Sequence, residues 1–221
     1  YEISECLVGS EMCIRDSYSK GEPREAIVAY TMLESGNWIL PMNYGVEIAY
    51  KPPFLYWTIA VISSILGGVS EFSARMPSAL AFLAMQLVFF SFVAKRKNVK
   101  TAFLTSILLL SSFEVHRAAV ACRLDMLQVS LIVISLCLLF RWDEKNCKGV
   151  PWLAVLLMAC ATLTKGPVGS IFPCLCIGIY QLLRGRSFGK AFFSLLGIGL
   201  LSLIPLGICL LYTSPSPRDT R

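Results

Sequence analysis

The sequence predicts an all-α protein, a polytopic transmembrane helix bundle with an extracytoplasmic loop that carries juxtamembrane helices. Two observations lead to this fold class. Of the 221 residues, 56% are hydrophobic and only 15% are charged, whereas soluble proteins average about 45–50% apolar and about 25% charged residues. The apolar residues are also grouped into long blocks that short polar connections separate, which is typical of integral membrane proteins.

The two ends of the chain do not continue this pattern. The segments CLVGSEMCIRDS (residues 6–17) and LLYTSPSPRDTR (residues 210–221) fit neither the periodicity nor the topology of the middle, and they resemble translated adaptor sequence. We therefore expect residues 1–17 and 212–221 to be non-native. The remainder is then a fragment that lacks a first membrane helix and whatever followed residue 211.

The first native part, residues 18–75, is the predicted extracytoplasmic loop. Within it, GEPREAIVAYTMLESGN is typical of a short amphipathic helix. The residues expected on its apolar face are Ala26, Ala29, Tyr30, Met32 and Leu33. Gly36 and Asn37 then favour the end of the helix.

An extended, proline-punctuated segment follows up to residue 53. Residues 54–69 are apolar but shorter than the roughly 20 residues that a membrane-spanning helix needs. Tyr56 and Trp57 suit the interface between lipid and water. We therefore expect this segment to be a helix that lies along the membrane surface.

Residues 76–211 form the predicted transmembrane bundle. Its candidate spans are residues 76–94, 101–113, 126–142, 152–164, 167–183 and 191–211. The connections at 95–100, 141–148 and 184–190 are basic, so the positive-inside rule places them in the cytoplasm. The other connections and the loop at 18–75 then share the opposite face, and the unusual polar residues gather there.

The remaining composition does not change this class. The net charge of +6 comes mostly from these short basic connections, so it gives no indication of a nucleic-acid partner. Six of the nine cysteines lie in or beside apolar runs, and no CxxC motif occurs. A cysteine in such a place is usually a small hydrophobic residue. His116, the only histidine, cannot define a metal site alone.

Four polar clusters fall on the predicted extracytoplasmic face. They are Glu22, Arg24 and Glu25; Glu47, Tyr50 and Lys51; Arg117, Arg123 and Asp125; and Lys165. Each has a purely structural alternative, respectively a helix start, an interfacial anchor, a helix cap and a solvated turn. Together they supply carboxylates that can accept a proton and cations that can neutralise a phosphate. Beside an apolar bundle, this combination favours transfer of a group carried on a lipid phosphate.

The motifs GEPREA, AYKPPFLYW, SEFSARMPSAL, CRLDM and ATLTKGPVG occur in an order that spans residues 21 to about 205. This order resembles the bacterial membrane glycosyltransferases of the GT-C fold. The family includes lipid A 4-amino-4-deoxy-L-arabinose transferase and, more distantly, the protein O-mannosyltransferases. The resemblance implies an enzyme of the bacterial inner membrane with a periplasmic active site. Its expected partners are membrane lipid, a polyprenyl-phosphate sugar donor and a lipid or protein glycoconjugate acceptor, with inversion at the anomeric carbon.

The resemblance also assigns the two candidate catalytic residues. The family has an Asp-Glu pair followed two residues later by Arg. Here Gly21 replaces the Asp, so Glu22 is the remaining carboxylate and Arg24 matches the arginine. Asp125 matches a functional aspartate in the second extracytoplasmic loop.

The candidate ligands of the donor phosphate are Arg24, Lys51, Arg123 and Lys165. Lys51 matches the lysine of the family's Glu-Lys-Pro motif, and Lys165 matches that of Thr-Lys-Gly. In the arabinose transferase the acid of Glu-Lys-Pro helps to hold a metal, but Tyr50 stands there in this chain. Glu47 is the nearest alternative acid, so Glu47 and Tyr50 are expected in an acceptor-related or metal-related role. No metal ligand is assigned, and a divalent metal stays open as a cofactor.

Two other classes of function compete with this one. A transporter or flippase for a lipid-linked substrate would place ionisable residues near helix midpoints and would break its helices. The charges of this chain fall at helix ends instead, which favours surface chemistry. A non-catalytic membrane subunit would tolerate alanine at both Glu22 and Asp125.

Overall fold

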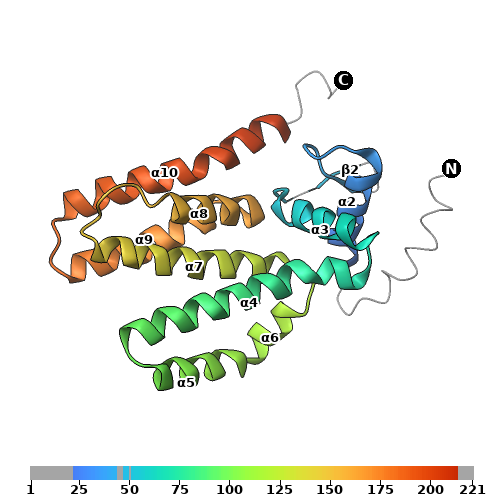
Figure 1. Cartoon of the computed structure of the whole chain (residues 1–221). Helices are drawn as coiled ribbons and strands as arrows, with labels where there is room; N and C mark the ends of the chain where they lie inside the picture. The colour runs from blue at the N-terminus through green and yellow to red at the C-terminus, as the bar shows by residue number, and fades with distance from the viewer. Residues whose placement is uncertain (1–21, 44–46, 50, 214–221) are drawn as a thin grey trace.

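The computed structural model describes residues 22–43, 47–49 and 51–213. Within these ranges the chain forms helices and one short antiparallel two-stranded sheet (Figure 1). The elements are α2 (Glu22–Ser35), β1 (Met42–Asn43), β2 (Glu47–Ile48), α3 (Phe54–Leu66), α4 (Glu71–Arg96), α5 (Val99–Leu110), α6 (Phe113–Ala119), α7 (Leu124–Glu144), α8 (Trp152–Lys165), α9 (Val168–Leu183) and α10 (Phe188–Thr213). The helical class is therefore confirmed. Residues 1–17 and 214–221, which include most of the expected non-native ends, lie outside the described residues.

Helix α2 occupies the expected amphipathic segment but is buried more widely than its pattern predicted. Ile27 and Val28 are buried together with Ala26, Ala29 and Met32. Tyr30 and Leu33, expected on the apolar face, are only half-buried. The reason is tertiary, because α2 packs against α3 on one side and against β1 on another.

Helix α3 begins directly after Pro53 and ends three residues before the predicted boundary. Gly67 has a φ of +86° in the left-handed region, and its N–H donates to the carbonyl of Ser63. Glycine adopts this conformation without strain, so it stops the helix. Ile65 and Leu66 at its end are exposed, which suits the expected position along the membrane surface.

The six predicted spans all contain helices, but they are of two kinds. Among the described residues, three helices are long and apolar enough to cross a membrane, namely Glu71–Arg96, Leu124–Glu144 and Ala191–Leu211. Helices α5, α8 and α9 have 12, 14 and 16 residues. The span expected at 101–113 is interrupted, because α5 ends at Leu110 and α6 begins at Phe113. The Ser111 hydroxyl bonds to the carbonyl of Leu108 there, and such local bonds compete with helix continuation.

Helix α7 is the centre of the bundle. Half of its most apolar window is buried, against 22% for α4 and for α10. It packs against α4 on one side and against α8 and α9 on the other (Figure 1). Any residue at an end of α7 is therefore held by several neighbouring helices.

The three basic connections lie together at one end of the bundle. Arg96 of α4 donates to both carboxylate oxygens of Glu144 at the end of α7, at 3.2 and 2.5 Å. Its guanidinium also lies 3.6 Å from the centre of the Phe92 ring. These contacts tie the first basic connection to the second.

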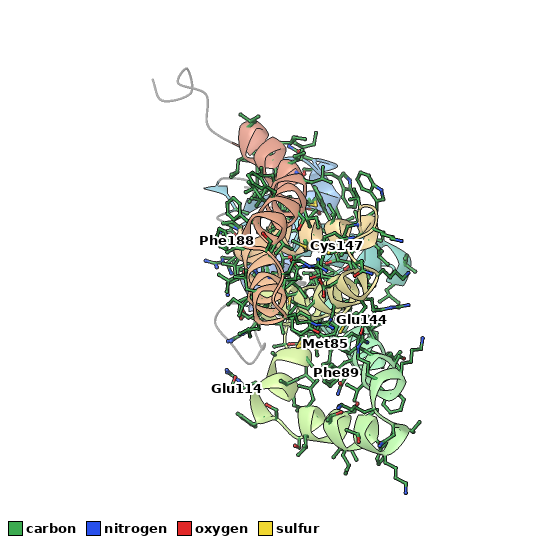
Figure 2. The ribbon with its side chains drawn as sticks, turned by 90° about the vertical axis from the view of Figure 1, so that its left-hand side faces the viewer. Met85, Phe89, Glu114, Glu144, Cys147 and Phe188 are labelled. Atoms are coloured by element: carbon green, nitrogen blue, oxygen red, sulfur yellow. The ribbon has the colours of Figure 1, made fainter. Side chains whose placement is uncertain are left out.

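The third basic connection joins them through Asp143. This buried carboxylate accepts a hydrogen bond from Gln181 of α9 at 2.8 Å and pairs with Arg186 at 3.1 Å. Figure 2 views this end of the molecule and labels Cys147 in the α7–α8 connection and Phe188 at the start of α10. The arrangement agrees with the sidedness expected from the positive-inside rule.

Candidate functional site

A cavity of about 190 Å³ opens at the other end of the bundle, between the start of α2, the start of α7 and the turn from α8 to α9. We call it the charged pocket. Its lining residues are Arg24, Glu25, Lys51, Cys122, Arg123, Leu124, Asp125 and Lys165. Five of these are residues that the sequence had marked as catalytic or phosphate-binding. The structure thus brings together side chains that are separated by up to 141 positions along the chain.

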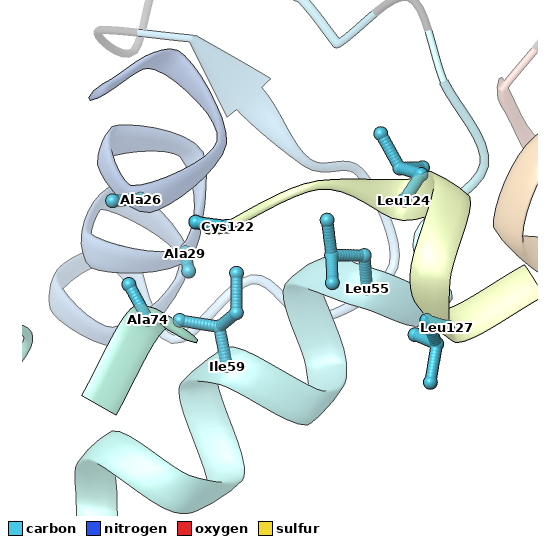
Figure 3. Packing of buried hydrophobic residues seen from close by; sticks show 8 residues of the cluster. All are labelled: Ala26, Ala29, Leu55, Ile59, Ala74, Cys122, Leu124 and Leu127. Carbon is cyan, nitrogen blue, oxygen red and sulfur yellow. The ribbon is translucent and has the colours of Figure 1, made fainter. Parts of the chain in front are cut away.

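A hydrophobic cluster beneath the charged pocket fixes these segments (Figure 3). Its buried members are Ala26, Ala29, Leu55, Ile59, Ala74, Cys122, Leu124 and Leu127. They come from α2, α3, α4, the α6–α7 connection and the start of α7. Helix α3 packs against both α2 and α4 and so joins these segments. Cys122 and Leu124 belong both to the cluster and to the pocket lining, so the floor of the pocket is part of the packed core.

A side chain of α4 holds the backbone of Arg123 in place. The Ser78 hydroxyl of α4 donates to the carbonyl of Arg123 at 3.2 Å. Arg123 has extended backbone angles and immediately precedes α7. This bond holds the residue before α7 against α4, two positions before Asp125, which also lines the pocket.

Glu25 is the buried charge of the pocket, and only 3% of its side chain is exposed. Its Oε1 accepts a hydrogen bond from the Lys51 ammonium at 3.0 Å, and the Arg24 guanidinium lies 3.7 Å from the same oxygen. Its Oε2 is buried and has no hydrogen-bond partner among the described residues. Because burial of an unpaired charge is costly, the Lys51 ammonium is held beside this carboxylate.

Tyr56 of α3 lies behind Glu25. Burial raises the pKa of the Tyr56 phenol far above its ordinary value, and the negative charge of Glu25 raises it further. The phenol therefore stays neutral, and it adds an uncharged polar group beside the Glu25–Lys51 pair.

Asp125 and Lys165 form the second ion pair of the pocket, with Oδ1 and Nζ 2.5 Å apart. Asp125 lies in the first turn of α7 and Lys165 is the last residue of α8. The helix dipoles favour a negative charge at the first position and a positive charge at the second. Each side chain is 49% exposed, so the pair contributes little to stability and is accessible to a ligand.

The other predicted site residues are not placed in the pocket. Glu22 is the first residue of α2 and Glu47 lies in β2, but the positions of their side chains lie outside the described part, as does Tyr50 altogether. Their assigned roles stay predictions. Arg117 pairs with Glu114 on α6 at 2.7 Å and does not belong to the pocket lining.

The sequence placed Glu25 in the first polar cluster, with a helix start as its structural alternative, but assigned it no individual role and no partner. Its partner Lys51 lies 26 positions along the chain. No helical or strand periodicity connects the two positions, so only the packing of α2 against the segment before α3 reveals the pair. The sequence contained one weak indication of this pair. Glu25 lies beside Ala26 and Ala29 on a helix with an apolar face, and an acid that is buried with such a face needs a partner.

The described residues do not supply a metal-ligand set. Among them, no three histidine, cysteine, aspartate or glutamate side chains come together. The two described carboxylates of the charged pocket are each bonded to a lysine. The donors on this part of the chain therefore do not fit a resident metal.

Known proteins share both the sequence and the fold. The chain is 34% identical over 165 residues to the undecaprenyl phosphate-alpha-4-amino-4-deoxy-L-arabinose arabinosyl transferase of Shewanella sediminis, which is 72% of this chain and 30% of that protein. It is 28% identical over 189 residues to such a transferase, numbered 2, of Proteus mirabilis, covering 83% of this chain and 33% of that protein. The chain thus spans about a third of the length of these curated relatives.

Two crystal structures of ArnT from Cupriavidus metallidurans are similar in fold. The apo form matches with a TM-score of 0.71 and 26% identity, over 96% of this chain and 40% of that chain. The form bound to undecaprenyl phosphate matches with a TM-score of 0.75 and 24% identity over the same shares. These matches confirm the polytopic bundle of GT-C type. A family model described as dolichyl-phosphate-mannose-protein mannosyltransferase matches residues 50–209, and the chain belongs to that family.

Proposed function

We propose that the full protein is a membrane glycosyltransferase that moves a sugar from a polyprenyl-phosphate donor to an acceptor outside the cytoplasm. The names of the relatives support the class of donor, because they specify an arabinosyl transferase of undecaprenyl phosphate-linked aminoarabinose. One solved relative was crystallised with undecaprenyl phosphate.

The charge balance of the pocket is the observation that carries the proposal. Four cations, Arg24, Lys51, Arg123 and Lys165, face two carboxylates, Glu25 and Asp125, which leaves a net charge of +2. A sugar-phosphate diester carries one negative charge, whereas a phosphate monoester carries about −1.5 to −2 at pH 7. The pocket therefore matches the departing lipid phosphate better than it matches the donor. Stabilisation that grows as charge develops on the leaving group accelerates the reaction.

The reaction follows from this arrangement. An acceptor hydroxyl or phosphate oxygen attacks the anomeric carbon, and the bond from that carbon to the phosphate oxygen breaks. The electron pair of this bond stays on the lipid phosphate, where Lys51 and Arg24 neutralise it. When Lys165 turns to the phosphate, Asp125 loses its partner and can accept the proton of an attacking hydroxyl. Glu22 remains the second candidate for that proton, from the resemblance alone.

The same geometry supports a site at the periplasmic face of the bacterial inner membrane. The charged pocket lies at the end of the bundle opposite the basic connections, which the positive-inside rule assigns to the cytoplasm. Exposed apolar residues such as Phe72 and Leu80 offer a surface for the polyprenyl tail on α4, the helix that contributes Ala74 to the cluster beneath the pocket. On this proposal residues 18–75 form the extracytoplasmic loop and residues 76–211 the membrane bundle.

The distribution of charge within the long helices favours transfer over transport. In α4 the charged residues are confined to the first five and the last two positions. In α7 they are Asp125 at the start and three residues in the last four positions. A transport pathway for a charged substrate would place such residues near the helix midpoints.

Lys51→Met tests the proposed function. In the full-length protein, assayed with a radiolabelled polyprenyl-phosphate sugar, we expect kcat/KM to fall about 10- to 100-fold, because a charged hydrogen bond contributes about 1.5–3 kcal/mol. Lys100→Met, at the basic end and exposed, is the matched control and should leave transfer unchanged. Equal rates for the wild type and Lys51→Met would refute the assignment.

A further inference from the structure

The described residues include two acids that are at least nine-tenths buried, Glu25 and Asp143, and they differ in how they are satisfied. Asp143 at the basic end accepts from Gln181 and Arg186 with one oxygen and lies 3.9 Å from Arg184 with the other. Glu25 accepts from Lys51 with Oε1, and the Tyr56 phenol lies close enough to interact with the same carboxylate, but its Oε2 makes no hydrogen bond of good geometry among the described residues. Asp143 therefore has the environment of a structural ion pair, whereas Glu25 retains an incomplete one beside the charged pocket.

We propose that Glu25 is a positioning residue for the transfer reaction, which presents the Lys51 ammonium to the donor phosphate and limits how tightly the lipid phosphate product is held. This inference rests on the proposed function. It concerns a residue to which the resemblance assigned no role, and whose contacts are all with protein groups.

The positioning step follows from the geometry of Lys51. Its backbone is restricted by the Pro52-Pro53 pair that follows. Its ammonium is fixed by the hydrogen bond of 3.0 Å to Glu25, while a third of its side chain remains exposed. A lysine side chain is flexible and loses much rotamer freedom when it is ordered. Glu25 orders it before the donor arrives, which is preorganisation of the kind that raises turnover.

The second step is electrostatic. With Glu25 ionised, the described pocket carries a net charge of +2, and without that charge it would carry +3. A more positive pocket attracts the dianionic lipid phosphate more strongly than it attracts the singly charged donor. Removal of the Glu25 charge should therefore tighten binding of the lipid phosphate product and slow its release. Turnover should not rise, because binding that is not specific to the transition state does not increase kcat.

Glu25→Gln separates this role from a merely structural one. The variant keeps the size of the side chain and an oxygen that can accept from Lys51, but it removes the charge. In the full-length protein we expect undecaprenyl phosphate to bind about three- to tenfold more tightly and kcat to fall about tenfold, with a lower KM for the donor. A structural role would lower the melting temperature and leave kcat, KM and product affinity of the folded protein unchanged.

Two further variants keep the test decisive if Glu25→Gln folds poorly. Glu25→Asp retains the charge, so product affinity should stay within about twofold of the wild type while kcat falls. Glu25→Gln combined with Lys51→Met removes both charges, and it should restore the melting temperature lost in Lys51→Met without restoring transfer.

Asp143→Asn is the matched control, a buried acid at the other end of the bundle. We expect it to change stability alone, and Glu144→Gln serves the same purpose at an exposed position.

The outcomes distinguish this inference from the proposed function. If the wild type binds undecaprenyl phosphate and transfers sugar, but Glu25→Gln binds that lipid equally or more weakly, Glu25 does not have the proposed role. If the wild type neither binds undecaprenyl phosphate nor transfers sugar, the proposed function itself fails and this inference fails with it. Tighter binding together with slower turnover in Glu25→Gln supports both.

Discussion

At the scale of single residues, the pocket contains two ion pairs with opposite properties. The Glu25–Lys51 pair is buried on the acid side, whereas the Asp125–Lys165 pair is half-exposed on both. Breaking a pair by removing one partner is strongly destabilising when the remaining charge is buried, but an exposed pair contributes only about 0–1 kcal/mol. Substitutions in the second pair can therefore report on chemistry with little effect on folding.

Asp125→Asn is the substitution that uses this difference. If Asp125 accepts the acceptor proton, kcat should fall by about 10²–10⁴, while the melting temperature should change little. Steady-state kinetics and thermal unfolding of the same purified protein measure both. Glu114→Gln, an exposed acid paired with Arg117 on α6, should behave as the wild type does. A loss of activity that merely follows a loss of folded protein would argue against a role in proton transfer.

The residue types of the site were predictable from the sequence, but their partners were not. Arg24, Lys51, Arg123, Asp125 and Lys165 were marked by type and motif, and all five line one pocket. The role of Glu25 and the pairing of Asp125 with Lys165 depend on contacts over 26 and 40 positions. Such contacts are set by tertiary packing, and the periodicity of hydrophobic residues contains no information about them.

At the scale of elements, the spacing of α8 and α9 determines where Lys165 lies. The two helices meet so closely that a Cβ on Gly169 would lie 2.5 Å from the backbone carbonyl carbon of Ala161. Lys165 and Gly166 form the turn just before this contact, and Gly166 has a φ of +97°. A side chain at position 169 would therefore push α9 away and displace the turn that carries Lys165.

Gly169→Ala should accordingly destabilise the protein by about 1–3 kcal/mol, as overpacking usually does, and should also lower kcat/KM. Gly197→Ala in α10 is the control, because no atom lies within 4 Å of the added Cβ and alanine favours a helix over glycine. Thermal unfolding and transfer assays of both variants provide the comparison. Equal stability of the two variants would mean that α8 and α9 are not packed this closely.

Element types were predicted well and element ends less well. Every predicted span contains a helix, because long apolar runs leave the backbone no other way to satisfy its polar groups in lipid. The break between α5 and α6 was missed, since Ser111 and Ser112 do not interrupt the apolar pattern strongly. The wider burial of α2 was missed because α3 and β1 both pack against it, and Val28 joins Tyr56 and Ala60 of α3 in a second hydrophobic cluster.

At the scale of the whole molecule, the two ends of the bundle differ in electrostatic character. The basic end collects the connections 95–100, 141–148 and 184–190, which together hold ten Lys and Arg residues and two acids. The described lining of the charged pocket has a smaller net charge, +2, from four cations and two carboxylates. This asymmetry was predictable because the positive-inside rule depends only on the composition and order of the connections. The same rule placed the pocket residues on one face of the membrane before any contact between them was known.

Sidedness is the property of the whole molecule on which the proposed function depends. Ser35 at the end of α2 and Lys148 in the α7–α8 connection are both exposed, and they belong to opposite ends of the bundle. We expect a membrane-impermeant maleimide to label Ser35→Cys in cells whose outer membrane has been permeabilised, and to label Lys148→Cys only in inverted inner-membrane vesicles. The seven described native cysteines are buried or half-buried, so the parent protein provides a background for subtraction. Labelling of both positions from the same side would place the charged pocket and the basic connections in one compartment. That result would refute a periplasmic active site opposite a cytoplasmic basic end.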